Sequence, residues 1–284
     1  MTTLVVAIAG PLTTVQDLGR PGYAHLGVPR SGALDQPALT LANRLVGNDP
    51  GAAGLEITLG PFAATLTAAG TVALTGAAAP FRVGGRPAPL NAPVAVRAGD
   101  RIEIGSTVLG LRGYLAVSGG LQAEVVLGSK STDTLSALGP AVVRGGDRLP
   151  IGPRTGEPAA VDVAPQPRLG RDATLRITWG PRADRFTDPH ALTHTRYTID
   201  ARSNRVGTRL VGTALARADA RELPSEGIVL GAVQVPADGQ PLVFLADHPT
   251  TGGYPVVAVV DPRDLPLLAQ ARPGDTVRFH GPEQ

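Results

Sequence analysis

The sequence predicts a mainly β protein built as two tandem β-barrel-like halves with a few short helices. Glycine and proline supply 36 and 27 of its 284 residues, and both types form turns and end regular elements. Apolar runs of strand length recur between these turns, which indicates a folded core and excludes a disordered chain. Residues 154–168 are rich in proline and lack periodicity, as expected of a linker. We therefore expect one half over residues 1–155 and another over residues 156–284.

Short β-type runs mark the expected strands. In the first half they are residues 4–9, 62–67, 71–75, 93–97, 101–104 and 107–118. In the second half they are residues 173–179, 228–235, 242–246, 256–260 and 276–279. Many short strands separated by turns are typical of antiparallel barrels.

Two helices are expected among these strands. Residues 35–46 carry apolar positions at helical spacing, with Asp35 placed to cap the start, Pro37 in the first turn and Gly47 after the end. A second, shorter helix is expected over residues 264–271.

Composition limits the classes of function. Lysine and arginine number 26 against 24 aspartate and glutamate, a formal net charge of +2, and no basic block that would follow a nucleic acid is present. The absence of cysteine excludes disulfides, thiolate nucleophiles and cysteine-bound metals. The first residues lack a basic signal-peptide segment, and no apolar run reaches the roughly 18 residues of a membrane span. We expect a soluble cytoplasmic protein.

Residues 16–35 form the most informative stretch of the chain. Four glycines and two prolines bend and stiffen it, so that the polar side chains Asp17, Arg20, Arg30 and Ser31 can be held in fixed places. The alternative is an ordinary ordered Ω-loop without a binding role.

The motifs of this stretch continue along the chain in an order that resembles the allophanate hydrolase subunit 2 family. The resemblance rests on residues 16–22, 27–35, 42–48, 55–61, 112–120, 127–132, 203–210, 225–228, 234–236 and 247–255. It therefore covers nearly the whole chain.

This resemblance implies a fold, an activity and partners. The fold would be a cyclophilin-like β-barrel in each half. The family includes the C subunit of ATP-dependent 5-oxoprolinase, which opens the cyclic amide of 5-oxo-L-proline to L-glutamate. That activity implies ATP shared with partner subunits, namely a subunit 1-like protein (the B subunit of 5-oxoprolinase) and the A subunit. It also implies that the chain alone is inactive.

Two other readings of the resemblance stay open. The family also includes the carboxyltransferase part of urea carboxylase, which acts on urea-like amides with biotin as cofactor. Met1 is the only methionine and no biotin-carrying context is present, so any biotin would arrive on a separate carrier. The third reading is a non-catalytic regulatory module that binds a subunit 1-like inhibitor of a kinase.

The chain departs from the family pattern at two positions. Pro249 stands where the family has glutamine, which removes an amide, and Asn204 stands where it usually has aspartate, which removes a carboxylate beside Arg205. Substrate preference can differ for this reason.

The loop over residues 127–134 contains Lys130, the only lysine, between serines and threonines. It fails the phosphate-loop pattern because the required glycines are missing. Its backbone N–H groups, hydroxyls and ammonium group could bind an anion, and the alternative is a solvated turn.

The run over residues 247–254 follows an apolar strand and ends in two glycines. Asp247 could act as a general base, and Thr250, Thr251 and Tyr254 could donate hydrogen bonds to a carboxylate or an oxyanion. The alternative is a hairpin turn. Glu226 could join Asp247 as a second carboxylate, although a solvated glutamate is the simpler interpretation.

Together these arguments predict one pocket where Arg20, Lys130 and Asp247 meet. The predicted catalytic residues are Asp247, Lys130 and Tyr254. The predicted substrate- or nucleotide-binding residues are Gln16, Asp17, Arg20, Ser31, Asp35, Asn43, Ser129, Ser131, Thr132, Arg205, Glu226, Gln234, Thr250 and Thr251. No metal site is expected, because His190 and His194 share a helical spacing but lack a third ligand.

Overall fold

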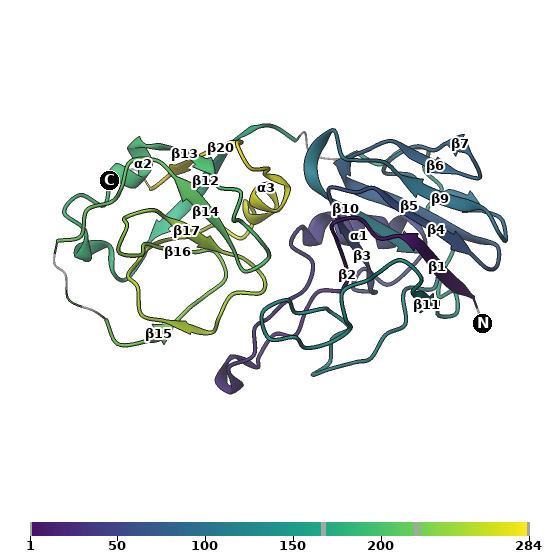
Figure 1. The fold of residues 1–284 in the computed structure, drawn as a ribbon, viewed down its shortest axis with the longest axis horizontal. Helices are drawn as coiled ribbons and strands as arrows, with labels where there is room; N and C mark the ends of the chain where they lie inside the picture. Colours follow the sequence, from purple (N-terminus) through teal and green to yellow (C-terminus); the bar gives the residue numbers. More distant parts are fainter. Residues whose placement is uncertain (1, 166–168, 219–220, 222, 283–284) are drawn as a thin grey trace. The chain divides into compact units, whose positions relative to one another are not determined.

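The chain divides into two compact units, shown as ribbons in Figure 1. The computed structural model describes residues 2–165, 169–218, 221 and 223–282. Unit 1 comprises residues 1–20, 35–133 and 137–169, and unit 2 comprises residues 21–34, 134–136 and 170–284. The last three residues of the expected linker, 166–168, lie outside the described residues.

The division between the units falls after residue 169, later than the expected position after residue 155. Backbone hydrogen bonds explain the difference. The N–H of Ala159 donates to the carbonyl of Leu45 at 3.0 Å, and the N–H of Ala164 donates to the carbonyl of Asn91 at 2.7 Å. These bonds tie the first part of the expected linker to unit 1.

Unit 1 contains two sheets. The six-stranded sheet has the order β11-β1-β4-β9-β6-β7, and the five-stranded sheet has the order β2-β3-β10-β5-β8. The strands are β1 (Thr3–Ile8), β2 (Leu12–Gln16), β3 (Gly54–Thr58), β4 (Phe62–Leu66), β5 (Gly70–Ala78), β6 (Phe81–Val83), β7 (Arg86–Pro87), β8 (Val94–Val96), β9 (Arg101–Ile104), β10 (Leu109–Val117) and β11 (Arg148–Pro150).

The two sheets of unit 1 share one apolar core. Side chains of the first sheet, among them Leu4 and Ile102, and side chains of the second, among them Leu55 and Leu115, are fully buried in the same cluster. Burying apolar surface from both sheets is the main stabilising contribution to this unit.

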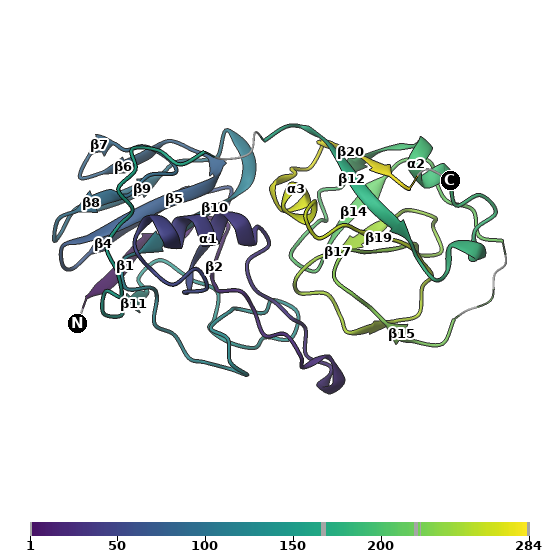
Figure 2. The same cartoon turned by 180° about the vertical axis from the view of Figure 1, so that it is seen from behind.

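Helix α1 (Gln36–Leu45) lies across β10 and β5 of the five-stranded sheet (Figure 2). Asp35 caps it, because its Oδ1 accepts the N–H of Ala38 at 3.0 Å, and a proline occupies the first turn. Gly47 follows the helix with a φ of 78°, a left-handed conformation that glycine adopts without strain. The predicted helix over residues 35–46 is confirmed.

Unit 2 is built on a closed barrel with the strand order β12-β19-β16-β17-β14-β13-β20. The barrel strands are β12 (Asp172–Trp179), β13 (Arg196–Ile199), β14 (Gly207–Val211), β16 (Ala232–Gln234), β17 (Leu242–Phe244), β19 (Val256–Val260) and β20 (Thr276–His280). The remaining elements are β15 (Glu226–Gly227), β18 (Thr251–Gly252), α2 (Ala191–His194), α3 (Leu265–Gln270) and the 3₁₀ turns η1 (Ala24–Leu26) and η2 (Ala183–Arg185).

Side chains along the barrel strands alternate between buried and exposed positions, and the buried ones fill the barrel. Leu175 and Ile177 of β12 are buried while their neighbours are exposed, and Val277 and Phe279 of β20 repeat the pattern. A period of two places every second side chain inside the barrel. Leu265 and Leu268 of α3 pack into the same apolar cluster.

The mainly β fold predicted from the sequence is confirmed, with corrections to individual elements. Several strands were not expected from the sequence. Among them, β2 and β13 carry buried polar or alternating residues without a strong apolar run. The strand expected over residues 228–235 is shorter, because Gly231 turns the chain with a φ of 83° and only Ala232–Gln234 remain extended.

Candidate functional site

Unit 2 contains a buried ion pair between Arg205 and Asp247. Both side chains are almost inaccessible to water, at 1% and 0% exposure. The guanidinium donates through Nε to Oδ2 and through Nη2 to Oδ1, each at 2.9 Å, so the contact is bidentate. This geometry is the strongest that arginine offers to a carboxylate.

Segments from distant parts of the chain complete this ion pair. The hydroxyl of Ser31 donates to Oδ1 of Asp247 at 3.0 Å, and Thr134 donates to Oδ2 through its N–H at 3.0 Å and its hydroxyl at 2.7 Å. Nη2 of Arg205 also donates to the carbonyl of Gly32 at 2.8 Å. We call Asp247, Arg205, Ser31, Gly32 and Thr134 the Asp247 cluster. Because both carboxylate oxygens are occupied, the cluster attaches two segments of unit 2 to its barrel.

Backbone geometry presents Ser31 to this cluster. Its φ is 54°, a left-handed conformation that is uncommon for residues other than glycine. Its N–H donates to the carbonyl of Ala246 at 2.9 Å, one residue before Asp247. The unusual backbone of Ser31 therefore lets its hydroxyl and its N–H bind neighbouring residues, Asp247 and Ala246, just after β17.

The electrostatics of the cluster favour a charged Asp247. Burial raises the pKa of Asp247, but the charge of Arg205 and the hydrogen bonds from Arg205 and Thr134 lower it more, so the pKa lies below its ordinary value. A general base needs a pKa near the working pH and a free oxygen. Asp247 has neither, and the geometry gives it a positioning role in place of proton transfer.

The rest of the 247–254 run lies beside Glu226. Strand β18 pairs with β15, with Gly252 opposite Glu226. The carboxylate of Glu226 accepts hydrogen bonds from the guanidinium of Arg182, which lowers the pKa of Glu226. Glu226 and Asp247 therefore each have an arginine of their own, Arg182 and Arg205.

The predicted donors at this end of unit 2 differ in exposure. Thr251 is exposed and Thr250 is half-buried, its carbonyl accepting the N–H of Ile228 at 2.9 Å. Tyr254 is 50% exposed, and the guanidinium of Arg217 lies 5.6 Å from the centre of its ring. Gln234 is buried and donates to the carbonyl of Tyr254 at 3.0 Å, which holds the turn in place.

In unit 1 the loop around Lys130 encloses a carboxylate of the chain itself. Oδ1 of Asp17 accepts the hydroxyls of Ser129 and Ser131, both at 2.6 Å, and the N–H of Gly19 at 2.7 Å. Oδ2 of Asp17 accepts the N–H of Lys130 at 2.7 Å. The donors that the sequence offered to an external anion are used internally, and Asp17, Ser129 and Ser131 serve to shape the loop.

The ammonium group of Lys130 points away from that carboxylate to neutral acceptors. Nζ lies 3.3 Å from the carbonyl of Leu121 and 3.1 Å from Oε1 of Gln122. An ammonium group has three N–H donors, so one remains without a partner among the described residues. Lys130 as a whole is half-buried.

Arg20 and Gln16 lie buried behind the same loop. Arg20 donates to the carbonyls of Val126 and Ser131, and Gln16 donates to Thr14 and to the carbonyl of Thr132 at 2.9 Å. Arg20 is only 1% exposed. These contacts hold the backbone of the loop on both sides of Lys130.

Two further predicted site residues also have structural roles. Asp35 caps α1, as described above. The Nδ2 of Asn43 donates to the carbonyl of Ala52 at 2.7 Å, and its Oδ1 accepts Nδ2 of Asn48 at 3.0 Å. Asn43 thus holds the turn after the helix.

A buried polar network in unit 1 was not predicted from the sequence. The hydroxyl of Tyr114 donates to Oε2 of Glu56 and accepts the N–H of Asp35, both at 2.8 Å, while Nε of Arg112 lies 3.5 Å from Oε1 of Glu56. Burial, followed by the charges of Glu56 and Asp35, raises the pKa of Tyr114 well above its ordinary value. The available signal was one charged residue inside each of two apolar strands, β3 and β10.

Two specific features, a metal-binding cluster and a membrane-spanning helix, are not found among the described residues. No group of three His, Asp or Glu side chains is arranged there to hold a metal ion. The ring of His190 packs edge-on against Trp179, with centroids 5.0 Å apart. Within the part of the chain that is described, no helix is long and apolar enough to cross a membrane.

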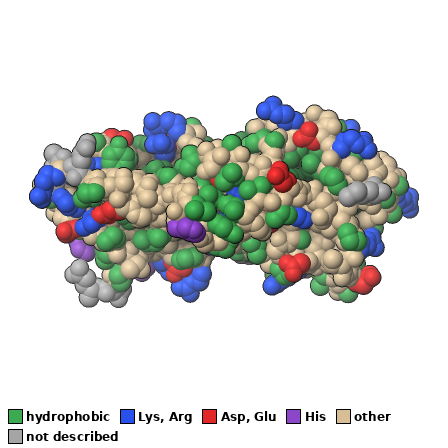
Figure 3. Space-filling model, turned by 90° about the horizontal axis from the view of Figure 1, so that it is seen from below, with side chains coloured by type: hydrophobic (Ala, Val, Ile, Leu, Met, Phe, Trp, Pro, Cys, Tyr) green, Lys and Arg blue, Asp and Glu red, His purple; other side chains and the backbone are tan. Residues whose placement is uncertain are grey.

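Acidic and basic side chains are dispersed over the face in Figure 3.

The whole chain is similar to a known domain. Residues 26–281 match the carboxyltransferase domain, subdomains A and B. The chain belongs to this family. The resemblance indicated by the motifs is confirmed.

This chain is 39% identical over 281 residues to the C subunit of 5-oxoprolinase from Escherichia coli. The match covers 97% of this chain and 90% of that protein. The chain is 33% identical to urea amidolyase of Saccharomyces cerevisiae, covering 98% of this chain but 16% of that protein. The crystal structure of K. lactis urea amidolyase matches with a TM-score of 0.92 at 28% identity, over 99% of this chain and 19% of that one.

The predicted residues thus fall into two groups. Arg20 and Lys130 lie together in unit 1, and Asp247 lies with Ser31 and Arg205 in unit 2. The meeting of Arg20, Lys130 and Asp247 at one pocket stays a prediction.

Replacing Arg205 by methionine is expected to lower the free energy of unfolding by about 3–5 kcal/mol, because Asp247 stays buried without its counter-charge. Trp179 is the only tryptophan and lies in β12, so its fluorescence during urea denaturation reports the unfolding of unit 2. The matched control is Arg263→Met, whose arginine pairs with Asp261 but is 75% exposed. The control is expected to cost less than about 1 kcal/mol. Equal losses for both variants would contradict the role assigned to the cluster.

The stability of unit 2 is expected to fall as the pH drops below about 6.5 because of His248. Burial lowers the pKa of His248 below its ordinary value of 6.5. Below that value the unfolded imidazole binds a proton more readily than the folded one, so the free energy of unfolding decreases with falling pH. Urea titrations at pH 7.0, 6.0 and 5.0 measure this slope, and His248→Gln should reduce it. An unchanged slope in the variant would assign the effect to another group.

Proposed function

We propose that this chain is the C subunit of an ATP-dependent 5-oxoprolinase, which hydrolyses the cyclic amide of 5-oxo-L-proline to L-glutamate together with partner subunits. The observation that carries this proposal is the 39% identity to the E. coli protein, which extends over 97% of this chain and 90% of that protein. A second protein of that name, from Haemophilus influenzae, is 32% identical over 94% of this chain.

The chemistry of the reaction explains why partners are needed. The amide of 5-oxoproline is stabilised by resonance, and its hydrolysis needs an activated carbonyl carbon and a positioned water molecule. In the proposed assembly ATP is the co-substrate that activates the carbonyl. The loop around Lys130 does not fit a phosphate group, because its hydroxyls and the Lys130 N–H already bind Asp17. We therefore assign no nucleotide contact to that loop.

Lys130 is the residue of this chain that we assign to substrate binding. Its ammonium group keeps one free donor among the described residues, and its two acceptors are neutral. Neither acceptor neutralises the positive charge of the ammonium group, so a carboxylate such as that of 5-oxoproline can bind there. The network of Asp17, Ser129 and Ser131 holds the lysine in position before the substrate arrives.

Tyr254 is the second candidate of the chain. Its 50% exposure leaves the hydroxyl available as a hydrogen-bond donor, and the guanidinium of Arg217 lies over its ring. Asp247 acts as a positioning residue in this proposal, because its oxygens are already occupied.

The proposed assembly includes a subunit 1-like protein (the B subunit of 5-oxoprolinase) and the A subunit, and we place it in the cytoplasm. We expect this chain to be inactive alone and to purify with the subunit 1-like protein as a hetero-oligomer. The names of the E. coli and H. influenzae relatives support membership of a multi-subunit enzyme.

A carboxyltransferase that acts on urea or a similar amide is the second candidate function. The family match and the 33% identity to urea amidolyase of Saccharomyces cerevisiae favour it. It would require biotin on a separate carrier protein. Transfer of carboxylate from carboxybiotin to urea, without hydrolysis of 5-oxoproline, would establish this alternative.

The proposed function is tested by purifying the chain with the partner subunits of its own genome and measuring L-glutamate formed from 5-oxoproline. We expect release of glutamate that depends on ATP, on the partners and on this chain. Omitting each component in turn provides the controls. Absence of turnover with all components present would refute the proposal.

Replacing Lys130 by methionine is expected to reduce kcat/KM for 5-oxoproline at least about tenfold, mainly through KM, because a charge-assisted hydrogen bond to the substrate carboxylate is lost. Arg148→Met removes an exposed cation of the same unit and should leave the kinetics unchanged. Since Lys130 is the only lysine, an amine-directed reagent modifies only Lys130 and the amino terminus. 5-Oxoproline should protect Lys130 from this reagent. Unaltered kinetics together with no protection would exclude Lys130 from the site.

A further inference from the structure

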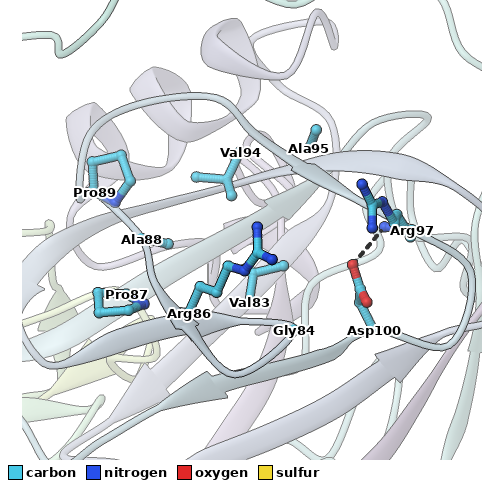
Figure 4. A pocket seen from close by; sticks show the side chains of 10 residues that line it. All are labelled: Val83, Gly84, Arg86, Pro87, Ala88, Pro89, Val94, Ala95, Arg97 and Asp100. Atoms are coloured by element: carbon cyan, nitrogen blue, oxygen red, sulfur yellow. Dashed lines mark hydrogen bonds between the residues drawn. The ribbon is translucent and has the colours of Figure 1, made fainter.

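A groove in unit 1 lies between the edges of its two sheets, and no residue of the loop 127–134 lines it (Figure 4). Strand β7 ends the six-stranded sheet, and β8 ends the five-stranded sheet. The cavity between the β6–β7 hairpin and β8 measures about 360 Å³. Small-molecule pockets begin at roughly this size, about 300 Å³.

Two guanidinium groups belong to this groove. Arg86 comes from the hairpin and Arg97 from the end of β8, and Figure 4 shows Arg86 extending from the hairpin toward β8. Neither side chain has an ion pair or hydrogen bond to another described residue. Other exposed arginines of the chain, such as Arg101, Arg196 and Arg263, pair with carboxylates of the chain.

The one carboxylate in the lining belongs to Asp100. Its Oδ2 accepts the backbone N–H of Arg97 at 2.9 Å, and the N–H of Asp100 donates to the carbonyl of Arg97 at 3.1 Å. Asp100 therefore closes the turn after β8. The lining keeps an excess of one positive charge, which favours an anion.

The walls of the groove are apolar and poor in backbone donors. Val83, Ala88 and Val94 line it, and Pro87 and Pro89 lie along the hairpin side. Proline has no N–H group, so this edge cannot form a regular ladder with an added strand. The edge chemistry favours a compact molecule over an extended peptide.

We propose that this groove binds a small organic anion, in which an oxyanion group contacts Arg86 and Arg97 and a compact apolar body lies against the valine and proline walls. Arginine binds planar carboxylates and phosphates through paired N–H donors. The site uses none of the residues assigned to 5-oxoproline and is independent of the proposed enzymatic function.

The test measures binding of phenylacetate, phenyl phosphate and the neutral phenylacetamide to the full chain by ligand-observed NMR. We expect at least one anion to bind with a Kd of about 1 mM or tighter, and phenylacetamide to bind at least fivefold more weakly. Preference for phenylacetate identifies a carboxylate ligand, and preference for phenyl phosphate identifies a phosphate ligand. Equal binding of the neutral compound and both anions would overturn the proposal.

Variants locate the binding in the groove. Arg86→Gln and Arg97→Gln should each weaken anion binding at least fivefold, and both residues are exposed, so folding is expected to be retained. Ala95→Trp fills the groove without changing charge and should abolish binding. Arg148→Gln is the matched control on the other edge of the six-stranded sheet and should have no effect. Equal weakening by Arg148→Gln, or unchanged binding in Ala95→Trp, would refute the site.

Discussion

Arg205 and Asp247 carry opposite charges and form an ion pair that is inaccessible to water, and the organisation of unit 2 depends on this contact. Removing such charges from water costs free energy, which only a bidentate contact and further hydrogen bonds can offset. Ser31, Gly32 and Thr134 provide those bonds. The requirement to satisfy one buried carboxylate therefore determines where two short segments of the chain lie within the unit.

The same principle operates in unit 1 with a different result. The carboxylate of Asp17 occupies the ring of donors formed by Gly19, Ser129, Lys130 and Ser131. A loop rich in hydroxyl and N–H donors attracts an anion, and here the chain supplies that anion itself. The consequence is a rigid loop that presents the single lysine on a fixed support. Lys130 gains its candidate role because its neighbours already have their partners.

The sequence predicted well those features that depend on local chemistry. Asp35, Pro37 and Gly47 mark the ends of α1 because caps and turn residues act within a few positions of the chain. Strands with clear alternation, such as β12 and β20, were also recognised. Strand β2 was not, because three of its four buried residues, Thr13, Thr14 and Gln16, are polar and interrupt the apolar run that marks a strand.

The sequence singled out candidate site residues but could not show their partners. The motifs pointed to Asp17, Arg205 and Asp247, yet residue type alone could not tell an occupied carboxylate from a free one. That distinction depends on partners distant in the sequence, such as Ser129 for Asp17 and Arg205 for Asp247. The network of Glu56, Arg112 and Tyr114 was missed for the same reason. The buried charge of Glu56 on β3 is explained only by Arg112 on the neighbouring strand β10.

Unit 2 is assembled from segments that are far apart in the sequence, and this affects how it can fold during translation. Ser31 and Asp247 are separated by 216 positions, so a nascent chain emerging from the ribosome exposes the serine long before the carboxylate exists. Contacts between such distant residues form slowly, because a large loop must close first. The early segment has to remain available through most of translation. A fragment that starts at residue 170 would contain the barrel strands and the Arg205–Asp247 pair, but it would lack the serine, the glycine carbonyl and the threonine that complete it.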